Sequence, residues 1–519
     1  MVSSRSPFHF MGDFLHNSPP YRSTYRMIPT ADLADARRKL IARLLTGNPA
    51  ADPEGPGVIS GQTIPQRKST GAAPLTCYQE QVYQHAQLAA QVAPDSLLYN
   101  ETITIYRNGF LDVAALEQSL TEIVRRHEAW RTSFELVDGE ARQIIHASQP
   151  VLLAIADLRD LPENERDAVS KKLALEDARR PFDLAKTPLF RFRLVRLDDE
   201  QYRLLLTAHQ IILDGVSVYH VLLPELAALY AAYSTSRFSP LAEPLIQCAD
   251  FAQWQAEQST ATFDNDLAFW RKQLQDRPLA LEVPADRVRP AVQTFRGAIQ
   301  PFVIGKELAD SLKDLTRVEG STLFVTMLTG FVALLHGLTG EEDVIIGTLA
   351  PTRKCSEVQR LLGYFLNPVV LRVNVSGHPT FQELIRRVRD VVLTALSHDG
   401  LPFHQLVAKL QPHSDLSRNP MYQLQFSLEP PMPAVDTAWN LTPMDVESGG
   451  AKLDLYVVVD ERIDGILGRA QYNPDLFDTT TITRLIEQYK ASLQVMVTRP
   501  NLRVADRLAH QQLSSTAVL

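Results

Sequence analysis

Several common structural features are missing from the sequence. No apolar run in its 519 residues approaches the roughly 18 residues needed to span a membrane, and Met1–Leu15 holds no apolar signal region. Its three cysteines, Cys77, Cys248 and Cys355, lie too far apart for a metal-ligand motif, which favours free thiols in a reducing compartment. We therefore expect a cytoplasmic protein with no membrane segment and no bound metal.

Basic clusters and several catalytic motifs are absent as well. The net charge is −8 and no stripe of Lys and Arg is present, which argues against a nucleic-acid partner. The sequence contains no G-x-S-x-G nucleophile motif, no Walker-type phosphate loop and no G-x-G-x-x-G dinucleotide motif. These absences exclude the three corresponding chemistries and indicate that the chain binds no cofactor of its own.

What the sequence does contain indicates an α+β protein of several parts. Residues 1–73 form an N-terminal extension and linker, in which residues 30–46 have the spacing of an amphipathic helix. The basic face of that helix is either solvated or a docking element for a partner protein. Helical and alternating patterns then fill two lobes, residues 74–275 and 276–505, followed by a tail at 506–519. In the second lobe the patterns predict strands over 344–347, 369–373, 423–428, 453–460 and 466–471.

One polar cluster stands out, in the stretch L-L-L-T-A-H-Q-I-I-L-D-G-V-S at Leu204–Ser217. The apolar run at its start predicts a buried strand that ends near His209 and Gln210, with Asp214 in the loop that follows. Polar groups at the end of a buried strand are common in active sites. Neighbouring residues of an extended segment face opposite ways, so His209 and Gln210 are not expected to reach the same cavity.

This stretch resembles the H-H-x-x-x-D-G motif of nonribosomal peptide synthetase condensation domains, which are related to chloramphenicol acetyltransferase. Six further segments resemble family motifs in the same order: Leu75–Tyr83, Arg126–Thr132, Asp250–Trp254, Gly363–Asn367, Leu401–Val407 and Ser417–Met421. The resemblance implies two acetyltransferase-like lobes in a V with a central tunnel. It also implies acyl transfer from a phosphopantetheine thioester on a partner carrier protein to an amine or hydroxyl acceptor, which a second carrier can present.

The family's second histidine, usually assigned the catalytic role, is replaced here. Counting back four residues from Asp214 reaches Gln210, and His209 matches the family's first histidine. A glutamine does not titrate near neutral pH, so Gln210 is not a general base. We expect it to orient the acceptor amine through its amide oxygen.

Other site residues are assigned from the resemblance. It implies that Asp214 forms a structural ion pair with Arg126, and that Gly215 lets the backbone turn tightly and approach the substrate. Three further residues are expected to line the tunnel: Ser217, Asn367 and Ser427.

Two functions remain open. The first is a condensation-type acyltransferase in nonribosomal peptide or mixed polyketide–peptide biosynthesis. The second is a platform without catalytic activity that binds carrier proteins or recruits a tailoring enzyme. The two functions differ in whether Gln210, in place of the family's second histidine, permits catalysis.

Overall fold

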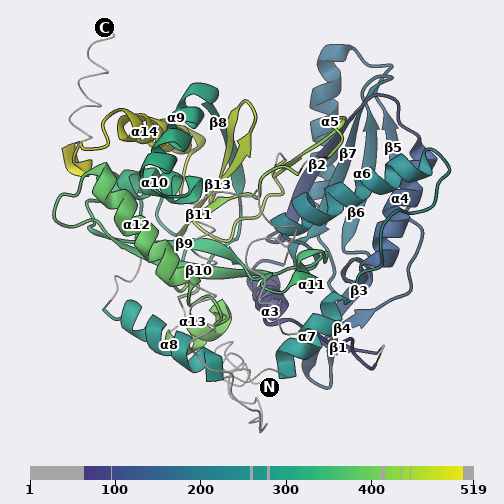
Figure 1. Cartoon of the computed structure of the whole chain (residues 1–519), viewed down its shortest axis with the longest axis horizontal. Coiled ribbons are helices and arrows are strands. Elements are labelled where there is room, and N and C mark those ends of the chain that lie inside the picture. The colour runs from purple at the N-terminus through teal and green to yellow at the C-terminus, as the bar shows by residue number, and fades with distance from the viewer. Residues whose placement is uncertain are drawn as a thin grey trace, which may run out of the picture.

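The computed structural model describes residues 64–69, 71–94, 96–257, 261–276, 281–410, 415–433, 435–444 and 446–506. Within them the chain forms two lobes of helix and sheet that meet in the middle of the molecule and diverge upward in Figure 1. The predicted α+β class with two lobes is confirmed. The predicted helix over 30–46 and the tail beyond Asp506 lie outside the described residues.

The N-terminal lobe is built on a five-stranded sheet in the order β12-β2-β7-β6-β5. These strands are β2 (Asn100–Asn108), β5 (Ala154–Asp157), β6 (Phe190–Arg196), β7 (Gln201–His209) and β12 (Trp439–Pro443). Neighbouring strands run antiparallel, except that β5 and β6 are parallel. A smaller sheet joins β1 (Ala73–Pro74), β4 (Glu140–Ile145) and β3 (Thr132–Val137).

Helices cover both faces of the five-stranded sheet, which explains the unbroken apolar run in β7. Leu204 and Leu206 belong to the same core as helix α4 (Val113–Arg126). Leu205 faces the other way, into a separate cluster with helix α5 (Glu163–Ala178). A strand buried on both faces needs apolar side chains at consecutive positions, because neighbours alternate in direction.

The C-terminal lobe contains a six-stranded sheet in the order β10-β9-β11-β13-β14-β8. Its strands are β8 (Ala298–Gly305), β9 (Asp343–Pro351), β10 (Leu366–Asn374), β11 (Leu424–Leu428), β13 (Leu455–Arg462) and β14 (Gly465–Tyr472). Helices α9 (Lys306–Val318), α10 (Leu323–Thr339), α12 (Phe381–Leu396) and α14 (Thr479–Thr498) pack with it in one core. The five predicted strands are present, and β8 was not predicted.

No single helix in the described part of the chain is long and apolar enough to cross a bilayer. Helices α9 and α10, which meet at an angle of 106°, satisfy the length and composition test only when taken together.

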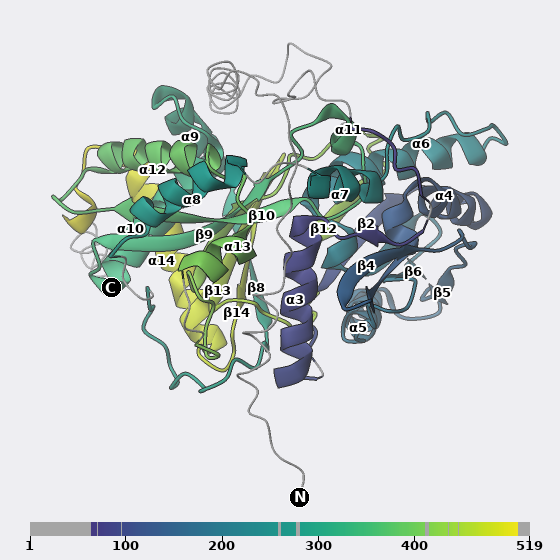
Figure 2. The same ribbon diagram turned by 90° about the horizontal axis from the view of Figure 1, so that it is seen from below.

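One strand of the C-terminal half joins the sheet of the first lobe. Strand β12 comes from the C-terminal half but pairs with β2, so that Leu441 lies opposite Ile105. The sequence predicted that residues 276–505 form the second lobe alone, and β12 departs from that division. Helix α3 (Cys77–Val92) stands between the lobes in both views (Figures 1 and 2). Gln79 of α3 donates a 3.5 Å hydrogen bond to the carbonyl of Ile211, which links this helix to the strand end singled out above.

The described end of the N-terminal extension packs on the first lobe. Ile64 is buried in the core of that lobe. Arg67 forms ion pairs of 2.7 Å with Glu128 and 2.9 Å with Asp250. Part of the segment predicted as a linker is thus attached to the lobe that follows it.

Trp439 holds the crossing strand in place. Its side chain is 4% exposed, its ring centroid lies 5.4 Å from that of Tyr230, and the guanidinium of Arg107 lies 5.2 Å from its ring. We expect Trp439→Ala to lower the free energy of unfolding by about 3–5 kcal/mol, because it leaves a cavity at the edge of the core. Thermal unfolding checks this, with Phe238→Ala, at a site that is 96% exposed, as control. Equal melting temperatures for the two variants would contradict the assignment.

Candidate functional site

The predicted polar cluster lies where β7 ends and the two halves of the chain meet. His209 is the last residue of β7, and Gln210 begins a short 3-10 turn, η2 (Gln210–Ile212). The loop through Asp214 then leads into a π-helical turn, η3 (Ser217–Leu222), and helix α6 (Leu223–Tyr233). The sequence pattern placed this strand end correctly.

Asp214 is paired with Arg353, and the predicted pair with Arg126 is wrong. The Nη2 atom of Arg353 lies 3.0 and 3.1 Å from the two carboxylate oxygens of Asp214, and both residues are buried. The carboxylate also accepts hydrogen bonds from the backbone N–H of Ser217 at 2.7 Å and of Phe365 at 2.9 Å. Three segments are therefore fastened at one carboxylate.

Arg126 is engaged elsewhere because of where its helix ends. The C-terminus of α4 lies against α6, which brings Glu225 to 3.3 Å from Arg126 Nε. His127, at the C-cap of α4, contacts the same carboxylate at 2.9 Å. Arg126 also donates a 2.6 Å hydrogen bond to the carbonyl of Ala242. These contacts make Arg126 a structural residue at the junction of α4 and α6.

Two of the three predicted lining residues are structural. Ser217 is fully buried, donates to the carbonyl of Gly363 at 2.8 Å and accepts from Arg353 at 2.7 Å. Asn367 is 1% exposed, and its amide bonds to the backbone of Asp399, Leu401 and Phe403 at 2.9 to 3.0 Å. Because their polar groups are buried and engaged, neither residue lines a tunnel here.

Ser427 lies on a different kind of surface. On β11 it shares a strand face with Gln425, which lies opposite Tyr456 of β13. The alternate positions, such as Phe426, point into the core of the C-terminal lobe. Ser427 therefore belongs to the polar face of this sheet, and its position beside a substrate stays a prediction.

His209 is buried and uncharged. Its side chain is 6% exposed, and its Nδ1 atom accepts a 3.2 Å hydrogen bond from the backbone N–H of Ile211. Its ring packs with those of Tyr99 and Phe182. Burial, and then the nearby charge of Lys452, lower the pKa of His209 to about 3. The imidazole is thus held neutral inside the first lobe, whereas Gln210 is partly exposed.

Gln210 meets a lysine from the other half of the chain. The ammonium of Lys452 donates a hydrogen bond to Gln210 Oε1. It also lies 4.5 Å from the centroid of the Tyr99 ring and 4.0 Å from a carboxylate oxygen of Glu101. The amide oxygen expected to orient the acceptor amine thus already accepts one hydrogen bond, and its role toward an acceptor stays a prediction.

Gly215 permits a close approach by another side chain rather than a turn. Its backbone is helical and does not enter the left-handed region, so the predicted tight turn is absent. A Cβ atom at this position would lie 2.6 Å from Oε2 of Glu429. Glycine thus leaves room for a carboxylate that follows β11 in the C-terminal half.

Glu429 is a titratable group in the loop's surroundings. Burial raises its pKa from 4.5 to about 7, Arg469 opposes this shift, and the carboxylates of Asp460, Glu101 and Asp214 add to it. No local pattern in the sequence pointed to Glu429, Lys452 or Arg353. Each reaches the loop through the association of segments that are far apart in the chain.

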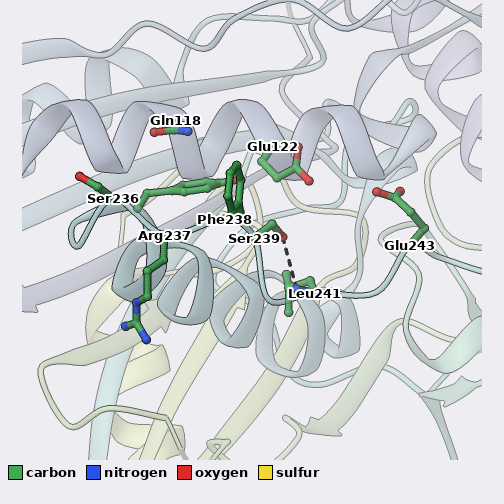
Figure 3. A pocket seen from close by; sticks show the side chains of 9 residues that line it. Gln118, Glu122, Ser236, Arg237, Phe238, Ser239, Leu241 and Glu243 are labelled. Carbon is green, nitrogen blue, oxygen red and sulfur yellow. Dashed lines mark hydrogen bonds between the residues drawn. The ribbon is translucent and has the colours of Figure 1, made fainter.

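Other features of the described residues do not contribute to this cluster. A surface depression lies between α4 and the segment after α6, lined by residues that include Gln118, Phe238 and Glu243 (Figure 3). None of its lining residues belongs to the loop at Gln210. No group of three or more His, Cys, Asp or Glu in the described part of the chain is arranged to hold a metal ion.

Sequence comparison shows what the chain is similar to. The profile described as Condensation domain matches residues 69–515. One of the linear gramicidin synthase proteins of Brevibacillus parabrevis is 36% identical over 453 residues, which cover 86% of this chain and 6% of that synthase. The chain thus spans only a small part of this curated relative.

Solved structures are similar over most of their length. A complex of the X-domain and OxyB from teicoplanin biosynthesis matches with a TM-score of 0.71 and 27% identity, covering 87% of this chain and 98% of that one. The first condensation domain of the calcium-dependent antibiotic synthetase, in complex with a substrate analogue, matches with a TM-score of 0.73 and 21% identity. It covers 84% of this chain and 99% of that one, and supports the fold alone.

The Asp214–Arg353 pair is testable by a double-mutant cycle. We expect Asp214→Ala and Arg353→Ala each to lower the free energy of unfolding by about 3–5 kcal/mol, because each leaves a buried charge unpaired. The double variant should lose much less than the sum. A cycle with Arg126→Ala is the control and should be additive to within roughly 0.5 kcal/mol. Coupling of Asp214 to Arg126 instead would contradict the assignment.

Glu429 should make stability depend on pH. Its folded-state pKa is raised to about 7, so the folded protein binds the proton more tightly than the unfolded chain. Its favourable contribution is therefore complete below about pH 4.5 and is lost as the pH rises through 7. We expect Glu429→Gln to raise the melting temperature by a few degrees at pH 8 and to change it little at pH 5. A stabilisation that is equal at both pH values would refute this origin.

Proposed function

The chain belongs to the condensation-domain family, and from that premise we propose that it is an active acyltransferase. It joins a carrier-bound acyl thioester to an amine, less readily to a hydroxyl, in nonribosomal peptide or mixed polyketide–peptide biosynthesis. The donor arrives on the phosphopantetheine arm of a partner carrier protein, and a second carrier is a suitable source of the acceptor. Both arms are substrates, and the chain supplies the site.

The observation that carries this proposal is that both halves of the chain build the loop after β7. Asp214 is fastened by Arg353 and by the N–H of Phe365, and Gln210 is met by Lys452. A buried ion pair of this kind is expensive to form and destabilising to break. Its presence around a loop whose second histidine has been replaced supports a site that still positions substrates.

The energetics favour activity without a base at position 210. A positioned acid–base group contributes about 10²–10⁴ in rate, or roughly 3–5 kcal/mol. Holding an amine against a thioester contributes on the order of 7–11 kcal/mol through proximity and orientation. Positioning is the larger effect, so the loss of the histidine slows the reaction without abolishing it.

The reaction needs no covalent intermediate on the protein. The amine nitrogen attacks the thioester carbonyl carbon, a C–N bond forms, and the C–S bond breaks. The sulfur leaves as a thiolate and takes up the proton released from nitrogen, giving an amide and a free thiol. Gln210 accepts no proton in this sequence of events, because a carboxamide does not titrate near neutral pH.

A platform without catalytic activity is the second candidate. The replacement at Gln210 favours it, and so does the likeness to the X-domain solved together with OxyB. On this reading the chain binds carriers or a tailoring enzyme, and Gln210 is dispensable. We also propose that residues 1–73 carry a docking element and that the chain works beside its carriers in the cytoplasm.

Turnover of a loaded carrier distinguishes the two functions. Carriers bearing a panel of aliphatic, aromatic and aminoacyl thioesters are incubated with the chain and an aminoacyl carrier, and intact mass is followed. We expect amide transfer by the wild type, a gain of about 10²–10⁴ in Gln210→His, and a loss in Gln210→Ala.

The variant Phe238→Ala, at a highly exposed site in the surface depression, is the control and should match the wild type. No turnover across the panel and no gain in Gln210→His would refute the acyltransferase. A stable complex with carrier or tailoring enzyme that survives Gln210→Ala would then support the platform.

A further inference from the structure

We propose that Lys452 is a positioning residue of the acyl-transfer site. It holds the Gln210 carboxamide by the oxygen, so that the NH₂ group faces the substrate and donates to the thioester carbonyl. Gln210 then stabilises the negative charge that develops on that oxygen in the transition state. This inference rests on the proposed acyltransferase function, and it assigns an orientation to the amide group of Gln210.

Lys452 is delivered to the site by backbone packing between the halves of the chain. A Cβ atom on Gly450 would lie 2.5 Å from the carbonyl oxygen of Leu97 and 2.8 Å from Cα of Leu98. Ala451 donates a 2.9 Å hydrogen bond to the carbonyl of Phe295. With so little room on either side, the backbone before Lys452 is fixed against the segment that leads into β2.

The ammonium is held on three sides in that position. It donates to Gln210 Oε1, lies 4.5 Å from the centroid of the Tyr99 ring, and lies 4.0 Å from Glu101 Oε1. The face of an aromatic ring attracts a cation, and the Glu101 carboxylate balances its charge. Tyr99 is itself fixed by a 2.7 Å hydrogen bond between its hydroxyl and His85 Nδ1.

The chemistry of the two groups decides which way the amide points. A protonated lysine is only a donor, so the atom of Gln210 that faces it has to be the carbonyl oxygen. The backbone of Gln210 is also fixed, because its N–H donates to the carbonyl of Tyr99 at 2.9 Å. The NH₂ group is therefore turned away from Lys452, and no described residue accepts a hydrogen bond from it.

A donor in this position suits thioester aminolysis. Attack on the carbonyl carbon moves negative charge onto the oxygen, and fixed donors aimed at that oxygen accelerate acyl transfer. The amide is polarised by the lysine on its oxygen, which strengthens its N–H groups as donors. A glutamine oriented in this way stabilises the charge on the carbonyl oxygen, whereas a general base removes a proton from the amine.

The orientation depends on the charge of Lys452. Burial lowers the pKa of Lys452, and the Glu101 carboxylate opposes that shift. The other titratable groups around it are His85 on α3, His209 at the end of β7 and the phenol of Tyr99. A neutral lysine is able to accept a hydrogen bond, so deprotonation removes the preference for one amide orientation.

The test is a double-mutant cycle on binding of a stable donor analogue, a phosphopantetheine that carries its acyl group as an amide in place of the thioester. Lys452→Met and Gln210→Ala should each weaken binding roughly tenfold. The double variant should be no weaker than either single variant, because Lys452 acts through Gln210. Additive losses would overturn the proposal, and so would unchanged binding in Lys452→Met.

Rate measurements on Lys452 variants test the role of Lys452 separately from the proposed acyltransferase function. We expect Lys452→Met to lower kcat/KM by about 10- to 100-fold, and Lys452→Arg to restore most of it. The wild-type rate should fall at alkaline pH, and Lys452→Arg should shift that fall upward. Lys313→Met, in a half-exposed ion pair with Glu461, is the matched control.

The two kinds of failure are distinguishable. If the binding losses of Lys452→Met and Gln210→Ala are non-additive but the wild type turns over no thioester, the proposed acyltransferase function is wrong and the Lys452–Gln210 contact stands. If the wild type turns over substrate and Lys452→Met matches it at every pH, the role of Lys452 is wrong. Melting temperatures of all variants exclude loss of folding as the cause.

Discussion

Asp214 and Arg353 are both removed from water and come from opposite halves of the chain, so neither side chain tolerates the loss of the other. Arg353 follows β9 of the C-terminal lobe, yet the segment after it packs into the core of the first lobe through Leu361, Leu362 and Phe365. The carboxylate of Asp214 receives that segment and the start of η3 at once. The position of the loop at Gln210 depends on this pair.

Near the Asp214–Arg353 pair, side chains of the C-terminal half also reach the loop at Gln210. Lys452 reaches Gln210, and Glu429 occupies the space that a side chain at Gly215 would fill. The pairing of strand β12 with β2 holds the segment before Lys452 close to the first lobe. Buried charges of this kind add little to stability, so their presence favours a role in placing groups for function.

Local pattern in the sequence was enough to predict some features of the site. Apolar spacing located the strand that ends at His209, and counting from Asp214 drew attention to Gln210, where the resemblance leads us to expect a histidine. The partners of the loop were not predictable in the same way, because Arg353, Lys452 and Glu429 are distant in the chain and sit in no recognisable pattern. The expected partner, Arg126, belongs to a motif resembling the family's, but the packing of α4 on α6 gives it Glu225 instead.

Burial and hydrogen bonding also distinguish polar residues that the sequence alone did not separate. Ser217 and Asn367 are polar and near the loop, but burial commits their hydrogen-bonding groups to backbone. Gln210 keeps its NH₂ group uncommitted within the described residues while its oxygen is held. What distinguishes a structural polar residue from a candidate functional one is whether its donors and acceptors are already used.

A structure of the chain with the amide donor analogue bound is the most direct measurement of the role of Gln210. We predict that the analogue's carbonyl oxygen lies at about 3 Å, hydrogen-bond distance, from Gln210 Nε2 while Lys452 remains on Gln210 Oε1. An analogue bound away from Gln210, or a Gln210 whose oxygen faces the ligand with Lys452 withdrawn, would contradict that role.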